Sequence, residues 1–94
     1  MAQKLFDQVA VNSNSGSWIK PDMDLLTVYV WGTFNGATVK VQFSPDGTEW
    51  FDDPIGELVF TQKLIRTQKV SVGTHIRAVI SDAGGSTNLS AWVL

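Results

Sequence analysis

Few residues of this chain could do acid–base or nucleophilic chemistry. His75 is the only imidazole among the 94 residues, and there is no cysteine. A serine or carboxylate nucleophile needs a base that a third group orients, and no motif around His75 supplies that group. The glycine-containing turn at residues 82–86 lacks both the lysine and the following helix of a phosphate-binding loop. We therefore expect no enzyme activity and no cofactor, and we interpret His75 as a solvent-facing strand residue beside a turn.

Four carboxylates lie close together in the sequence, at Asp46, Glu49, Asp52 and Asp53. Ca²⁺ takes about six to eight oxygen ligands, and this segment does not have the spacing of an EF-hand loop. Asp46 also has a local explanation, because its neighbours Pro45 and Gly47 favour a tight turn. A carboxylate pair for glycoside hydrolysis must flank a cleft, which so small a domain does not indicate. We expect neither a metal site nor a catalytic pair here.

Aromatic side chains are more informative. The chain has 4 Trp, 1 Tyr and 5 Phe, which is many for a small core, so some rings must lie near the surface. Tyr29 and Trp31 stand two residues apart on a predicted strand, on the face opposite its aliphatic residues. Two interpretations remain open. The rings form a platform for sugars or a partner protein, or else Trp18, Trp92 or the segment 57–72 covers them as a second layer of core.

Two further rings, Trp50 and Phe51, follow the predicted Asp-Gly turn. Adjacent residues of a strand point to opposite faces, so we expect one ring to face inward and the other outward. The outward ring is a candidate anchor for a partner.

Charge and composition exclude several classes of protein. The chain has 7 Lys and Arg against 9 Asp and Glu, a formal net charge of −2. A protein that binds a phosphate backbone concentrates Lys and Arg on one face, so we do not expect nucleic acid as a partner. No run of about 18 apolar residues predicts a membrane span, and residues 1–14 lack the apolar region of a secretory signal. We expect cytoplasmic synthesis and no membrane association.

The length predicts a single domain over residues 1–94. A chain of this size buries only about 60–65% of its unfolded surface, and without cysteine no disulfide can add stability. We therefore expect self-association or docking on a larger body to contribute.

The whole chain is predicted to form strands, because β-branched and aromatic residues are interrupted by turn residues about every ten positions. Residues 25–34 are the strongest strand, with Leu26, Val28 and Val30 on the core side. Asn-Gly at 35–36 predicts a hairpin to a return strand at 38–44, since a type I′ turn needs positive φ at both central residues. A second tight turn is predicted at residues 44–48.

Further strands are predicted at residues 75–81 and 88–94, and the long stretch 57–72 must bend, which we place near 66–68. Residues 12–17 read as a polar, mobile loop, so the apolar segment before it belongs to a possible N-terminal arm over 1–17. Seven to nine short antiparallel strands predict an all-β, two-layer sandwich of Ig-like or jelly-roll-like type. A barrel is the alternative.

The segment 28–50 reads V-Y-V-W-G-T-F-N-G-A-T-V-K-V-Q-F-S-P-D-G-T-E-W. It resembles small virion structural proteins of tailed bacteriophages, in which a hydrophobic strand ends in Gly-x-aromatic-x-Gly-Ala-Thr-Val and is followed by Ser-x-Asp-Gly-x-x-Trp. Residues 73–81, with Arg77 near the start of a strand, also resemble this family. The resemblance covers about two thirds of the chain, from Leu25 onward.

The resemblance implies a capsid decoration (cement) or head-stabilising protein on the virion surface, whose partner is the major capsid protein. It also implies a homo-oligomer, for which we expect a trimer at threefold positions. The alternative is a glycan- or receptor-binding module of a phage fibre or tail. The candidate interface residues combine the N-terminal segment with the surplus rings: Leu5, Phe6, Val9, Tyr29, Trp31, Trp50 and Phe51.

Overall fold

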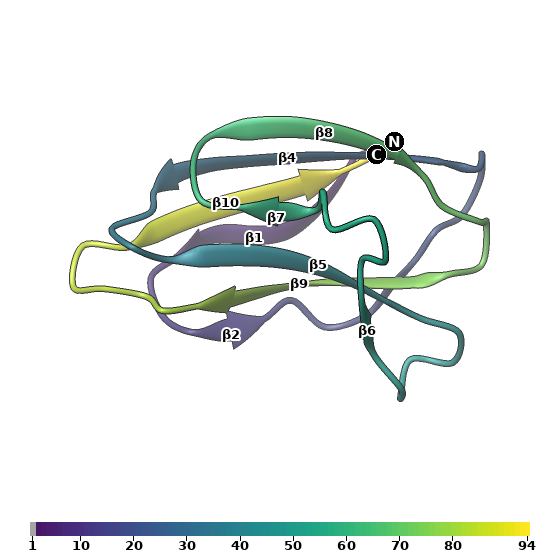
Figure 1. Cartoon of the computed structure of the whole chain (residues 1–94), viewed down its shortest axis with the longest axis horizontal. Helices are drawn as coiled ribbons and strands as arrows, with labels where there is room; N and C mark the ends of the chain where they lie inside the picture. The colour runs from purple at the N-terminus through teal and green to yellow at the C-terminus, as the bar shows by residue number, and fades with distance from the viewer. Residues whose placement is uncertain (1) are drawn as a thin grey trace.

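The computed structural model describes residues 2–94 and contains ten strands and no helix within them (Figure 1). All the strand pairings are antiparallel. The predicted all-β sandwich is therefore confirmed, with short edge strands raising the number above the expected seven to nine. The strands are β1 (Gln3–Val9), β2 (Ser13–Asn14), β3 (Trp18–Ile19), β4 (Leu25–Thr33), β5 (Thr38–Ser44), β6 (Phe51–Asp52), β7 (Val59–Phe60), β8 (Leu64–Lys69), β9 (His75–Ser81) and β10 (Asn88–Val93).

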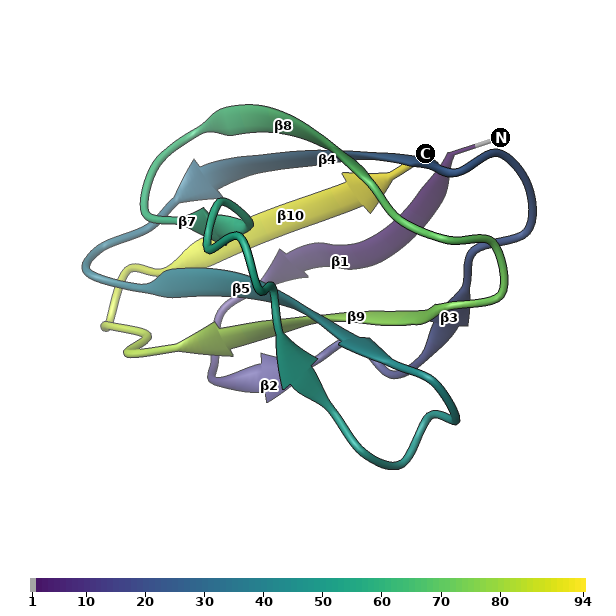
Figure 2. The same ribbon diagram turned by 45° about the vertical axis from the view of Figure 1, so that its right-hand side comes forward.

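The strands form two sheets; in Figure 2 the first-sheet strands β8, β4 and β10 lie above β5 and β9 of the second sheet. The first sheet has the order β1-β10-β4-β8. The second sheet is centred on β9 and β5; the short strands β2 and β3 pair with β9, and β6 and β7 pair with β5. The first sheet thus consists of long strands only, whereas the second has two long strands in the middle and short strands at its edges.

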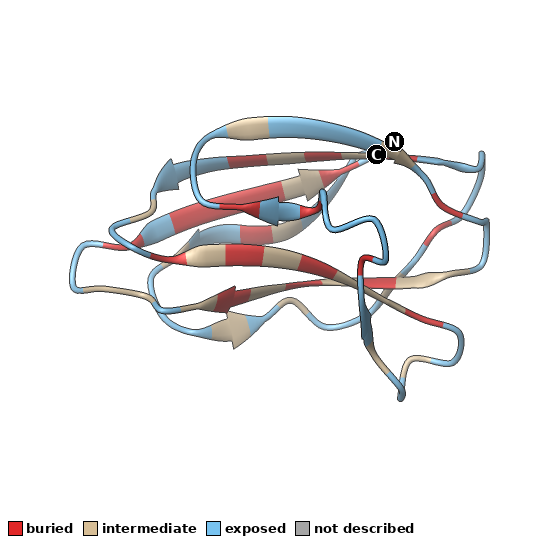
Figure 3. Ribbon diagram, viewed as in Figure 1, coloured by how far each residue is buried: buried red, intermediate tan, exposed pale blue. Residues whose placement is uncertain are grey.

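The core lies between the two sheets and follows the alternation of the sequence. Leu26, Val28 and Val30 on β4 are almost completely buried, as are Val39 and Val41 on β5. Figure 3 shows the same alternation of buried and more exposed positions along β5 and β9. The predicted inward face of β4 is therefore confirmed, and β5 and β9 follow the same rule, because a side-chain period of two commits one face of each strand to the core.

The predicted hairpin between residues 25–34 and 38–44 is wrong, although its turn is present. Asn35 and Gly36 have φ of 48° and 86°, and the Ala37 N–H donates to the Phe34 carbonyl at 2.9 Å. The two strands that this turn joins belong to different sheets: β4 pairs with β10 and β8, whereas β5 pairs with β9. Both neighbouring positions of β4 are occupied by strands distant in sequence, so the turn carries the chain across the core.

The stretch 57–72 bends earlier than predicted. Its first part, β7, pairs with β5 in the second sheet, and its later part, β8, pairs with β4 in the first. The chain crosses at residues 61–63, and residues 66–68 lie within the regular strand β8 instead of at a bend. The reason is that Phe60 and Leu64 both face the core from opposite sheets, which leaves the intervening polar residues to make the crossing.

The N-terminal segment is part of the sandwich. β1 pairs with β10, and Phe6 is buried, only 4% exposed, within the core. The polar run 12–17 contributes β2, in which Ser13 pairs with Ile80 of β9. The described part of the expected arm, residues 2–17, therefore lies against both sheets, because pairing with β10 and burial of Phe6 hold it there.

Candidate interaction face

The residues that could do chemistry are used in local structure. His75 is half-buried, and its Nδ1 lies 2.8 Å from the Ser17 hydroxyl. The turn at Gly47 packs on this ring, since a Cβ at position 47 would lie 2.9 Å from His75 Nδ1. Within residues 2–94, no group of three or more His, Asp or Glu side chains could hold a metal ion.

Asp46 organises the turn that was predicted around it. Its Oδ1 accepts from the backbone N–H groups of Thr48 at 2.8 Å and Glu49 at 3.1 Å, and Ser44 Oγ lies 3.1 Å away. These bonds lower the pKa of Asp46 below the usual aspartate value, the Thr48 bond contributing most. The carboxylate is therefore a turn residue, as its sequence neighbours indicated.

Asp53 organises the loop between β6 and β7. Its carboxylate accepts from the Gln68 amide at 2.7 Å and from the backbone N–H groups of Ile55, Glu57 and Leu58 at 2.9–3.1 Å. Burial raises the pKa of Asp53, but these donors outweigh it and leave the pKa below its usual value. Asp53 thereby links the second sheet to β8 of the first.

The outer face of the second sheet carries a closed polar network. Arg77 Nε donates to Gln42 Oε1 at 2.9 Å, and Gln42 Nε2 donates to Asp52 Oδ1, also at 2.9 Å. Lys40 Nζ lies 3.9 Å from the same carboxylate, and the Arg77 guanidinium lies 4.4 Å from the Trp50 ring centroid. The polar groups of this face are thus largely paired with one another, and the exposed Ile19 and Val59 lie on its short edge strands β3 and β7.

The outer face of the first sheet is chemically different. Register places Lys4, Trp92, Tyr29 and Ile65 in one row across β1, β10, β4 and β8. Trp31 lies two residues along β4 from Tyr29, and Leu94 follows Trp92 with the same spacing, so both share this side of the sheet. We call this surface the aromatic face; it consists of Tyr29, Trp31, Ile65, Trp92 and Leu94.

The aromatic face is open to solvent in several places. Trp31 and Leu94 are each 39% exposed and Ile65 is 59% exposed. The Trp31 and Trp92 ring centroids are 6.3 Å apart with an interplanar angle of 38°, and Lys4 Nζ lies 5.2 Å from the Trp92 centroid. The two tryptophan rings therefore pack against each other at a tilted angle, and no other layer of residues 2–94 covers this face.

Two hollows flank the pair Tyr29 and Trp31. One, of about 520 Å³, is bounded by these rings and by Lys63, Leu64 and Ile65 of the β8 side. The other, of about 280 Å³, lies on the β10 side and is lined by the same two rings together with Ala2, Trp92 and Leu94. A partner surface that fits this face would place side chains into both hollows.

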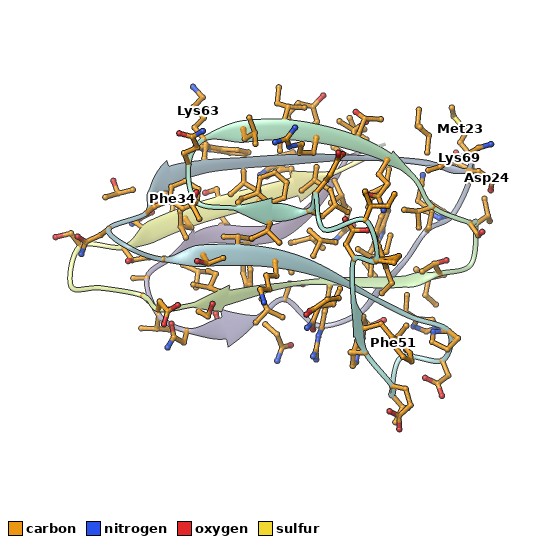
Figure 4. All side chains as sticks on the ribbon, viewed as in Figure 1. Met23, Asp24, Phe34, Phe51, Lys63 and Lys69 are labelled. Atoms are coloured by element: carbon orange, nitrogen blue, oxygen red, sulfur yellow. The ribbon has the colours of Figure 1, made fainter. Side chains whose placement is uncertain are left out.

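Of the seven candidate interface residues, only Tyr29 and Trp31 belong to the aromatic face. Leu5 and Val9 are half-buried against the core, and Phe6 is a core residue, which corrects its expected place at an interface. Trp50 is half-buried beneath Arg77, so Phe51, which is 61% exposed, is the outward ring of that pair. Figure 4 shows Phe51 on β6, at the margin of the molecule opposite β8.

Three members of the aromatic face were not predicted as interface residues: Ile65, Trp92 and Leu94. Trp92 and Leu94 could have been found from alternation, since Leu89, Ala91 and Val93 of β10 face the core. Ile65 could not, because the next residues on its side of β8, Thr67 and Lys69, are polar and only its pairing with Tyr29 places it beside the rings.

Comparison with known proteins adds no relative. No protein-family model, curated protein or solved structure matches this chain. Within residues 2–94 there is no helix that could span a membrane.

Proposed function

We infer that this protein is a capsid decoration (cement) protein of a tailed bacteriophage, which binds the outer surface of the head lattice through its aromatic face. The observation that carries the proposal is the cluster of rings on the first sheet, where Trp31 and Ile65 are exposed beside Tyr29 and Trp92. The outer face of the second sheet instead carries a polar network, with the exposed aliphatic residues Ile19 and Val59 on its short edge strands. The phage association itself rests on the sequence resemblance at residues 28–50.

The mechanism of a cement protein is mechanical. Large, rigid rings contribute contact area with few rotatable bonds to immobilise, so a surface of this kind favours protein association. Binding only to the assembled lattice stabilises that state by mass action, and many copies on a repeating shell add their effects. A small domain without disulfides also gains stability from the partner.

Fractionation of virions tests this role. The protein should sediment with intact heads in a copy number that matches the lattice, and heads without it should rupture at a lower temperature or during genome packaging. Sedimentation with tails, or a protein that stays free, would contradict the proposal.

Trp31→Ser tests the face. The ring is 39% exposed and lines both hollows of the aromatic face, and loss of such an anchor weakens binding by about 30-fold or more. The matched control is Phe51→Ser, which removes an exposed ring from β6 and should leave head binding within about twofold. Titration of purified heads with each variant measures the difference; equal binding of the two variants would show that the aromatic face is not the contact.

A glycan-binding module of a fibre or tail is the second candidate. It is favoured by the hollow of about 520 Å³, in which Tyr29 and Trp31 offer rings for sugar stacking and Lys63 offers a hydrogen-bond donor. Binding on a glycan array that disappears in Trp31→Ala while the fold persists would support this candidate over cementing.

Self-association is part of the proposal. A homotrimer would bury further apolar surface of a small domain, and we keep the trimer as the expected state. Sedimentation equilibrium of the wild type and of Trp31→Ser shows whether the aromatic face forms the trimer contact or binds the lattice. If Trp31→Ser remains a trimer, the face is available for the lattice.

A further inference from the structure

The two edges of the first sheet differ in how they are protected. β1, at one edge, has irregular register between Lys4 and Phe6 and again between Phe6 and Val9, and Gln8 has a φ of 53°. Bulges of this kind prevent another strand from pairing. β8, at the other edge, pairs with β4 in continuous register over six residues and forms the upper margin of the molecule in Figures 1 and 2.

β8 presents unpaired backbone groups along this edge. The Val70 N–H donates to the Asp24 carbonyl at 3.2 Å, whereas Thr27 exchanges bonds with Leu94 on the other side of β4. In an antiparallel sheet, successive residues of a strand direct their N–H and C=O groups to opposite sides. Val70 bonds toward β4, so every second residue before it does the same, and the residues between them, Ile65, Thr67 and Lys69, direct their N–H and C=O groups away from β4. The side chains of all three residues are exposed, so nothing in the described chain closes the middle of this edge.

In the described part of the chain, the cations that have neither an ion pair nor a side-chain hydrogen bond lie on β8 or directly before it. Within residues 2–94, the ion pairs are Lys4 with Asp7, Lys20 with Asp22 and Lys40 with Asp52, and Arg77 is bonded to Gln42. The remaining cations are Lys63, Arg66 and Lys69, and all three are exposed on β8 or directly before it. Figure 4 shows Lys63 and Lys69 near opposite ends of the strand.

We propose that the β8 edge binds an acidic, extended segment of a partner protein, which adds to the first sheet as a fifth strand. The backbone groups of Ile65, Thr67 and Lys69 supply the main-chain hydrogen bonds. Lys63 and Lys69, on the same side of the sheet as Ile65, select carboxylate side chains on that side of the added strand, and Arg66, which pairs with the inward-facing Val28, lies on the other side. This inference does not depend on the capsid role, because it rests on the backbone groups and cations of β8 and not on the rings of the aromatic face.

Charge also decides which occupant fits. Two copies of this chain cannot pair through β8, because antiparallel pairing of the strand with itself would bring Lys63, Arg66 and Lys69 of both copies together without any carboxylate on either strand. Cations on an edge strand also discourage unspecific pairing of uncharged strands. An acidic strand is the one extended partner for which the same cations are favourable.

Binding of a short synthetic peptide that alternates Glu and Val, with blocked termini, tests the proposal on the full chain. The backbone amides of Ile65, Thr67 and Lys69 should exchange with solvent about tenfold more slowly at a peptide concentration of about ten times Kd. Binding should weaken as salt rises, since the contacts are exposed charges. A peptide that alternates Lys and Val should not bind.

Two substitutions separate backbone pairing from charge. Thr67→Pro removes an outward N–H from an edge position where proline is tolerated, and it should weaken peptide binding by about tenfold or more while the thermal midpoint stays within a few degrees. Lys69→Glu, which leaves the backbone groups in place and reverses a charge on the side that meets the glutamates, should weaken binding by a similar factor, whereas the charge reversal Lys40→Glu, on the second sheet, should change it by about twofold at most.

Several outcomes would overturn the proposal. They are absence of binding at millimolar peptide, protection of amides elsewhere than β8, and equal effects of Lys69→Glu and Lys40→Glu. A proline-rich polyglutamate peptide or a single-stranded DNA oligonucleotide that binds as tightly as the Glu-Val peptide would also do so, because attraction of any polyanion does not require strand addition. If Thr67→Pro does not fold, the comparison of the two charge reversals decides.

Discussion

Single side chains hold the corner at which the chain crosses between the sheets. Thr87 is only 4% exposed; its hydroxyl donates to the Phe34 carbonyl at 2.8 Å and accepts from the Gly84 N–H at 2.8 Å. One buried hydroxyl therefore joins the turn after β4 to the loop before β10. Because a type I′ turn alone would also allow a hairpin, these bonds help to keep β4 and β5 in separate sheets.

Thr87→Val tests this corner. Valine has nearly the same shape but leaves the Gly84 N–H without an acceptor and the Phe34 carbonyl with the Ala37 N–H alone, which should lower the free energy of unfolding by about 1–3 kcal/mol. Urea denaturation of both proteins measures the change. A variant as stable as the wild type would show that the hydroxyl does not hold the corner.

Asp53→Asn tests the loop clamp at the same scale. The four donors around this carboxylate favour its charged form, so the amide should lower the free energy of unfolding at neutral pH by about 1–3 kcal/mol. The pKa of Asp53 is lower in the folded chain than in the unfolded one. The stabilisation is therefore present above the ordinary pKa and is lost as pH falls through the folded value.

The difference in stability between wild type and Asp53→Asn should accordingly shrink as the pH falls below about 4. Denaturation at a series of pH values measures that difference, and comparison of the two proteins cancels the titration of Asp46. A difference that stays constant down to acid pH would contradict the assignment.

At the scale of the strand, Gly32 is what allows β10 to lie close to the end of β4. Its φ is 121°, and a Cβ at this position would collide with the backbone carbonyl of Asn88. Gly32→Ala therefore combines backbone strain with displacement of the neighbouring strand, and should lower the free energy of unfolding by about 2–3 kcal/mol. Thermal denaturation provides the measurement, with Gly36→Ala as a control for positive φ in open space. Equal losses in the two variants would show that the approach of β10 adds nothing.

At the scale of the whole molecule, the long strands pair with partners that are distant in sequence. β1 pairs with β10 from the opposite end of the chain, β4 with β10 and β8, and β5 with β9. The radius of gyration, 12.3 Å, is that of a compact domain of this length. Both ends of the chain therefore have to be present before the first sheet is complete.

This topology predicts slow folding for a small domain. Non-local pairing requires loops to close before contacts form, so we expect refolding on a timescale of about milliseconds to seconds. Stopped-flow tryptophan fluorescence after dilution from denaturant measures the rate. Refolding in microseconds would mean that local structure, and not the long-range pairing, sets the barrier.

The alternation of apolar and polar residues by itself determined the fold class, the inward faces of β4, β5 and β9, and the outward position of Tyr29 and Trp31. It could do so because the direction of a side chain on a strand follows from a period of two and needs no partner. The Asp46 turn was equally local, since its bonds lie within a few residues.

Only the tertiary structure decided which strands are neighbours, because pairing depends on segments far apart in the chain. It turned the Asn35–Gly36 hairpin into a crossing between sheets, moved the bend of residues 57–72 and placed β1 in the first sheet with Phe6 in the core. Pairing also set Ile65 and Trp92 beside Tyr29 and left β8, with its cations, at a free edge. No local pattern contains these juxtapositions, since each results from the competition of several strands for the same neighbour.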